Sequence, residues 1–242
     1  MKYFAIETSL NEKILGKYPP VKGFIHHCNV DEEPNFIDKF IFEKIEIQPI
    51  LSNVVLYANA KQTDLIDVLG DVGFNFGYLI SDKFKQILNQ FNCYGFQFFK
   101  TSIFQKDTQF NNYWQAKIYD FPYQYINFSK TNFSLKNSLT REIVKESIEI
   151  NDLKDFQKKI DTLEFPFSIS ISDISYIDSM NLDFFNIRFF TNGGFKGMVS
   201  ERLKNELEKN EITGIEYRPI EISFQDWVKR DGPRDQIYGR SW

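Results

Sequence analysis

The sequence has few of the residues that build metal sites and disulfide frameworks. Its 242 residues include two histidines, His26 and His27, and two cysteines, Cys28 and Cys93, which form no CxxC pair. These numbers exclude a disulfide framework and favour a reducing compartment. The chain has no apolar run of the roughly 18 residues that a membrane-spanning helix needs, and its opening MKYFAIETS lacks the apolar core of a secretion signal. We therefore expect a cytoplasmic protein with no membrane partner.

Neither sign of charge dominates the composition. The chain has 29 Lys and Arg against 33 Asp and Glu, a formal net charge of −4. This balance gives no general attraction to nucleic acid or to an anionic membrane. Apolar residues make up 42% and aromatic residues 17% of the chain, which excludes a disordered protein. Its length suits one large domain or two halves of about 120 residues.

One stretch of the chain occurs twice. Residues 79–99, LISDKFKQILNQFNCYGFQFF, align without a gap with residues 198–218, MVSERLKNELEKNEITGIEYR. Four aligned positions are identical: Ser81 and Ser200, Lys85 and Lys204, Leu88 and Leu207, and Gly95 and Gly214. The spacing of the copies favours two related halves.

Each copy predicts a strand, a helix and a return strand. Ser81 and Ser200 stand where a hydroxyl can accept a hydrogen bond from the first free amides of a helix. Gly95 and Gly214 permit the backbone turn into the return strand. Apolar residues at helical spacing predict one buried face in the first copy: Phe84, Ile87, Leu88 and Phe91. The second copy has Glu206 in place of Ile87, so we expect its helix to lie nearer the surface.

Strands outnumber helices in the remaining sequence. Alternating apolar residues predict strands at residues 2–8, 40–47, 113–119, 123–128, 141–150, 165–174 and 184–190. Helices are expected at residues 63–69 and 153–163, capped by Thr63 and Asp152. A doubly wound fold would need a helix after nearly every strand, so the pattern favours an α+β fold with mainly antiparallel or mixed sheets and a few short helices packed on them. The expected organisation is an N-terminal half at residues 1–110, a C-terminal half at residues 111–228, and a flexible basic tail at residues 229–242.

One compact group of side chains that can ligate metals suggests a metal site. His26, His27 and Cys28 are adjacent, with acidic residues 31–33 just beyond. Zinc needs three or four ligands, and adjacent histidines on a strand point to opposite faces, so at most one of them joins Cys28. An ordinary strand end is the alternative interpretation of this set.

Motifs of known catalytic chemistry are missing as well. The sequence has no GxSxG, HExxH, P-loop or GxGxxG pattern. We therefore expect a protein without catalysis, metal or cofactor. Two alternatives stay open: a small metal-dependent hydrolase using His26 and Cys28, and a ligand-binding scaffold with a groove between the two halves.

The end of the chain combines basic and aromatic residues. Arg and aromatic side chains dominate protein interfaces, so Trp227 and Arg230 are candidate contacts to a protein partner. Basic residues beside aromatics can also bind nucleic acid. The basic residues here are four: Lys229, Arg230, Arg234 and Arg240. Four positive charges at the end of an acidic chain make nucleic-acid binding the weaker interpretation, and we expect no nucleic-acid partner.

The second copy and the strand before it carry a recognisable signature. Ile187-Arg188-Phe189 is an apolar-Arg strand, residues 199–204 read valine-serine-acid-x-leucine-lysine, and residues 213–217 read threonine-glycine-apolar-x-aromatic. This pattern, from Phe185 to Pro219, resembles immunity protein family eleven of bacterial polymorphic toxin systems, formerly a domain of unknown function. The matched positions are structural, so no functional residue is carried over.

The resemblance implies a bacterial immunity protein of interbacterial competition. Such a protein protects its producer by binding a cognate toxin and covering the toxin's active site or substrate channel. If the toxin is a basic nuclease, complementary charge would speed association, and Asp31, Glu32 and Glu33 are the densest acidic group available. A solvated turn is the alternative interpretation of these residues.

Overall fold

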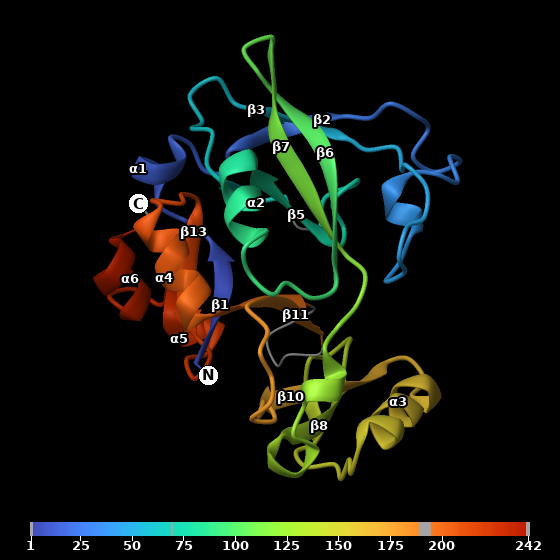
Figure 1. The fold of residues 1–242 in the computed structure, drawn as a ribbon. Helices are drawn as coiled ribbons and strands as arrows, with labels where there is room; N and C mark the ends of the chain where they lie inside the picture. The colour runs from blue at the N-terminus through green and yellow to red at the C-terminus, as the bar shows by residue number, and fades with distance from the viewer. Residues whose placement is uncertain (1, 69, 189–194, 241–242) are drawn as a thin grey trace.

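The computed structural model describes residues 2–68, 70–188 and 195–240. Within these residues the strands form sheets of four, six and three strands, with short helices packed against them (Figure 1). The expected α+β fold with antiparallel and mixed sheets is confirmed. No helix in these ranges has the length and apolar character needed to cross a bilayer.

The elements follow one another in three sheets. The four-stranded sheet has the order β11 (Phe184–Arg188), β12 (Phe195–Ser200), β1 (Tyr3–Thr8) and β13 (Ile215–Pro219). The six-stranded sheet has the order β2 (Val21–Ile25), β3 (Asn53–Leu56), β6 (Phe96–Gln105), β7 (Thr108–Ile118), β5 (Gly77–Ser81) and β4 (Leu65–Ile66). The three-stranded sheet has the order β10 (Phe167–Asp173), β8 (Asn132–Asn137) and β9 (Ile143–Lys145). The helices are α1 (Glu12–Leu15), α2 (Asp82–Leu88), α3 (Leu153–Thr162), α4 (Glu201–Lys209), α5 (Phe224–Val228) and α6 (Pro233–Tyr238), with 3-10 turns η1 (Ile37–Lys39), η2 (Tyr123–Tyr125) and η3 (Phe128–Lys130).

The duplicated sequence forms two copies of one structural unit. In the copies, β5-α2-β6 corresponds to β12-α4-β13, and β4 pairs with β5 as β11 pairs with β12. Ser81 accepts a hydrogen bond from the Phe84 amide at 3.1 Å, and Ser200 accepts one from the Leu203 amide at 3.2 Å. Helix α2 buries three residues and α4 buries two, as Glu206 in place of Ile87 predicts.

The central strand of each unit comes from a different part of the chain. Strand β7 follows β6 directly and lies between β5 and β6, whereas the N-terminal strand β1 lies between β12 and β13. Ser81 pairs with Tyr113 on β7, and Ser200 pairs with Tyr3 on β1. Both tyrosine hydroxyls donate to a backbone carbonyl two residues before the first strand of their unit, at 2.9 and 3.1 Å. The second unit is therefore a circular permutation of the first, completed by the N-terminus.

Two aspartates connect the units. Ser81 Oγ donates to Asp64 at 2.6 Å, and Ser200 Oγ donates to Asp183 at 2.5 Å. Asp64 also accepts a backbone N–H at 2.9 Å from the loop between α4 and β13, which belongs to the second unit. Asp183 accepts a backbone N–H at 3.0 Å from the loop between α2 and β6, which belongs to the first. Each unit thus holds a loop of the other through the aspartate that also binds its own helix cap.

This arrangement corrects the expected domain boundary. The division between residues 110 and 111 falls inside β7, and β1 from the first half completes the sheet of the second. Residues 123–174 form a small lobe between the two units along the chain, at the bottom of Figure 1, with its own apolar core. The prediction was wrong because local patterns do not reveal which strands pair across long separations.

Three predicted elements were also wrong. Residues 40–47 form no strand or helix, because Phe42 has a φ of 52° and breaks the extended run. Residues 63–68 contain the short strand β4 instead of a helix, and residue 69 lies outside the described residues. Residues 123–128 form η2 and the start of η3 instead of a strand.

Other predicted elements differ only at their ends. Strand β10 begins at Phe167, and Phe165 is 77% exposed. Strand β11 ends at Arg188, and the residues after it, 189–194, lie outside the described residues. Asp152 caps α3 as predicted, accepting from the Asp155 amide at 2.8 Å.

The expected flexible tail, residues 229–242, contains the docked helix α6, and residues 241–242 lie outside the described residues. Arg234 on α6 is buried and forms a double ion pair with Glu216 on β13, with both N–O distances 2.7 Å. The Tyr238 hydroxyl accepts from the Tyr217 backbone N–H at 2.9 Å, which satisfies part of the open edge of β13. A basic, glycine-containing sequence predicts a loose end, but here the buried partner Glu216 fixes it.

We expect Ser81→Ala and Ser200→Ala each to lower the free energy of unfolding by about 1–2 kcal/mol. Each substitution removes a helix cap and also a donor to the aspartate that connects the units. Urea denaturation measures the effect, with Ser129→Ala, an exposed serine of the small lobe, as the control that changes stability by less than about 0.5 kcal/mol. Equal stabilities of all three variants would contradict the structural role of the caps.

Candidate functional site

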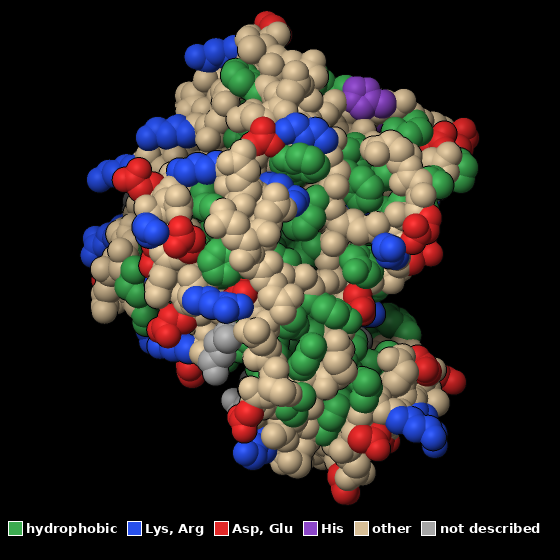
Figure 2. Space-filling model, viewed as in Figure 1, with side chains coloured by type: hydrophobic (Ala, Val, Ile, Leu, Met, Phe, Trp, Pro, Cys, Tyr) green, Lys and Arg blue, Asp and Glu red, His purple; other side chains and the backbone are tan. Residues whose placement is uncertain are grey.

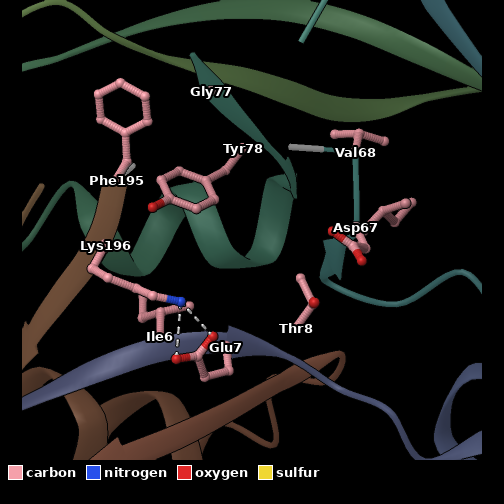
Figure 3. Close-up of a pocket in the computed structure, with 11 residues that line it drawn as sticks. Ile6, Glu7, Thr8, Asp67, Val68, Gly77, Tyr78, Phe195 and Lys196 are labelled. Atoms are coloured by element: carbon pink, nitrogen blue, oxygen red, sulfur yellow. Dashed lines mark hydrogen bonds and ion pairs between the residues drawn. The ribbon is translucent and has the colours of Figure 1, made fainter. Parts of the chain in front are cut away.

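Two hollows meet beside β1, where the first and second units adjoin. One is lined by β1, β12, β5 and the residues after β4, and the other by β1, β13, α5, α6 and Tyr18. Their volumes are about 450 and about 480 Å³, including solvent at their mouths. Both are lined by Glu7, Thr8 and Asp67, so we treat them as one site, the junction cleft (Figure 3).

Two ion-paired glutamates lie in this cleft. Glu7 and Glu216 are cross-strand partners on β1 and β13, so their side chains share one face of the sheet. Glu7 accepts from Lys196 Nζ at 2.9 Å and from Arg218 Nε at 2.8 Å. Glu216 is paired with Arg234. These cations compensate the repulsion of two neighbouring carboxylates in a partly buried place.

Asp67 has no such compensation. Thr8 lies beside it in the lining of both hollows, and within the described parts of the chain no Lys or Arg lies at ion-pair distance from its carboxylate. Burial raises the pKa of Asp67 above its ordinary value, and the negative charges of Asp71 and Glu7 raise this pKa further. Burial, and then the charge of Asp67, raises the pKa of Tyr18. Figure 3 shows the Asp67 carboxylate facing Thr8 across the cleft.

The remaining walls are aromatic and apolar. Phe195 and Tyr78 lie on one side of the first hollow (Figure 3), and Trp227 closes the second. The Tyr78 hydroxyl is fixed by a 2.7 Å hydrogen bond to Asn186. Gly197 permits this position, because a Cβ there would lie 2.6 Å from the Tyr78 hydroxyl oxygen. The cleft thus offers apolar surface around one unpaired carboxylate.

The residues predicted to contact a partner do not come together. Trp227 is fully buried, which corrects its prediction as a surface contact, since its indole packs inside the cleft wall. The Arg230 side chain is 85% exposed, and its Nε lies 4.0 Å from the carboxylate of Asp231. Asp31 and Glu32 are exposed and Glu33 is half-buried. They lie on residues 26–50, at the right of Figure 1, opposite α5 and α6.

The predicted metal-type residues have other partners. His26 Nδ1 lies 2.7 Å from Ser52 Oγ, and His27 Nε2 lies 2.5 Å from Asn53 Oδ1. Cys28 packs against a small apolar cluster. Within residues 2–68, 70–188 and 195–240, no three His, Cys, Asp or Glu side chains are placed to hold a metal ion.

No protein-family model matches the chain, and no curated protein matches it. The junction cleft is therefore interpreted from its own chemistry. Sequence reasoning missed it because its charged residues come from β1, the residue after β4, β12, β13 and α6, which are distant along the chain. A usable signal was Glu7, the charged residue of a strand whose four preceding residues are apolar or aromatic.

We expect Asp67→Asn to raise the free energy of unfolding at neutral pH. The folded-state pKa of Asp67 lies above its ordinary value of 3.8, so the folded protein holds this proton more tightly than the unfolded chain. The resulting penalty is absent at low pH and develops as pH rises from the unfolded pKa through the folded one. Urea denaturation from about pH 4 to about pH 7.5 measures it. The difference between variant and wild type grows with pH, whereas Asp107→Asn, at the exposed β6–β7 turn, shows no such trend. A constant difference would contradict the assignment.

We expect Arg234→Ala to destabilise the protein by about 3 kcal/mol or more, because it leaves the buried carboxylate of Glu216 without its cation. Arg230→Ala is the matched control, since that exposed side chain contributes less than about 0.5 kcal/mol. Thermal and urea unfolding distinguish the two variants. Equal stabilities would restore the interpretation of residues 229–240 as a loose tail.

Proposed function

We propose that this chain is an immunity protein that binds a cognate bacterial toxin and blocks its active site or substrate channel. It would act inside the producing cell and without catalysis of its own. The observation that carries the proposal is the resemblance of residues 185–219 to immunity protein family eleven of polymorphic toxin systems.

The placement of the matched residues supports this interpretation of the motif. Ser200 caps α4, and Met198 and Val199 are fully buried. Gly214 has a φ of +84°, and a Cβ there would lie 2.2 Å from the Leu65 carbonyl oxygen. These positions maintain the scaffold, so a toxin-binding surface would lie outside the motif.

Residues 26–50 offer such a surface. Phe36 and Ile37 are buried and anchor this segment, and Asp38 accepts hydrogen bonds from Gly73 N at 2.6 Å and from Asn75 Nδ2 at 2.9 Å. Figure 2 shows acidic side chains gathered over this segment, at the right edge of the molecule. An anchored acidic segment suits a basic toxin, because complementary charge accelerates association and opposes wrong partners.

Co-expression with the toxin encoded by the adjacent reading frame tests the proposal. Cells that express the toxin are expected to grow only when this protein is present, and the two proteins are expected to co-purify. Asp31→Ala with Glu32→Ala is expected to slow association about 10-fold at low salt. The control pair is Glu142→Ala with Glu146→Ala, two exposed acidic residues of the small lobe. Growth of toxin-expressing cells without this protein would refute protection.

The junction cleft favours a second candidate function, that of a ligand-binding module. Apolar walls surround convergent polar groups, an arrangement typical of small-molecule sites. The unpaired Asp67 carboxylate is the feature that favours this candidate, because an uncompensated charge lowers stability and has no structural use.

A further inference from the structure

The charges of the junction cleft do not cancel locally. Each Lys and Arg that lines it already has a carboxylate partner: Lys196 is paired with Glu7, and Arg234 with Glu216. Asp67 is left over, without a cationic partner in the described part of the chain, and shares the lining of both hollows with Thr8. A bound cation would neutralise Asp67 as the other carboxylates are neutralised. An anion would instead be repelled by Asp67 and would find the cations of the cleft already paired.

The shape and lining of the cleft limit the kind of cation that can bind there. Asp67 borders both hollows, which leaves room beside it for a chain of several carbon atoms. Phe195 and Tyr78 in one hollow, and Tyr18 in the other, present aromatic surface that suits an alkyl stem and a cationic head. A bare metal ion would need several oxygen ligands, and Asp67 has no second free carboxylate beside it in the cleft lining.

We propose that the junction cleft binds an alkylammonium or alkylguanidinium group, with Asp67 as its counter-ion. This inference rests on the second candidate function, ligand binding, and not on toxin binding. The group has two possible sources: a free small amine, or a Lys or Arg side chain of another protein.

The groups around Asp67 set the pH dependence of binding. Thr8 and Glu7 face it from β1, Asp71 from the loop after β4, and Tyr18 from the segment after α1. Binding needs the ionised carboxylate, so affinity increases as pH rises through the raised pKa of Asp67 and then stays constant until the ligand loses its own proton.

Calorimetry on the full chain tests the proposal with n-butylammonium and n-butylguanidinium as probes. n-Butanol and butyrate, which share the alkyl stem, are the neutral and anionic controls. We expect the two cations to bind and Asp67→Asn to weaken them by about 10- to 100-fold, while Asp107→Asn leaves their affinity unchanged. Equal binding of n-butanol, or undiminished binding to Asp67→Asn, would overturn the proposal. Because Asp67→Asn is expected to stabilise the fold, lost binding would not reflect unfolding.

A second arm identifies the source of the cation. N-acetyl-lysine amide and N-acetyl-arginine amide carry the same head groups on a peptide backbone. If these amides bind as well as n-butylammonium and n-butylguanidinium do, the cleft is assigned to a protein side chain. If only the two n-butyl cations bind, the cleft is assigned to a small metabolite. Absence of binding by all four cations refutes the inference. No toxin is present in these measurements, so their failure is distinct from a failure of protection in cells.

Discussion

The structure depends on two aspartates, Asp64 and Asp183, each of which binds a helix cap of its own unit and a loop of the other. Asp183 is fully buried and accepts from Ser200, from Arg202 Nη2 at 2.5 Å, and from a backbone amide of the other unit. Burial alone would raise its pKa, but the hydrogen bonds, the one from Arg202 above all, lower this pKa below the ordinary value. Asp64 repeats the arrangement without an arginine. A buried charge with several donors, as at Asp183, is costly to disrupt.

The permuted order of the second unit explains where the cleft lies. Glu7 on β1 occupies the position that Lys117 occupies on β7, given the matched registers of the two units. In the first unit, residues 26–50 cover this face, and burial lowers the pKa of Lys117 to about 8. In the second unit, α5 and α6 cover the corresponding face incompletely and leave a hollow beside Glu7. One duplicated scaffold thus carries a closed face and an open one.

The two proposed functions use different parts of this scaffold. Toxin binding would use the acidic segment over the first unit, and cation binding would use the open face of the second. Neither uses the strand, cap and turn residues that the two copies share. This division follows from the energetics, because the shared residues are buried and their contacts maintain the fold.

The sequence by itself determined the repeated unit, the caps Ser81, Ser200 and Asp152, and the α+β class, because each depends on residues close together in the chain. It also marked the acidic residues 31–33 as candidate partner contacts, of which Asp31 and Glu32 are exposed and Glu33 is half-buried. Tertiary structure decided that β1 completes the distant unit, that Arg234 fixes the tail to Glu216, and that Trp227 is internal. It also placed Asp67 in a cleft without a cationic partner among the described residues. Each of these depends on strand pairing and charge compensation between residues far apart in sequence, and local pattern does not specify such contacts.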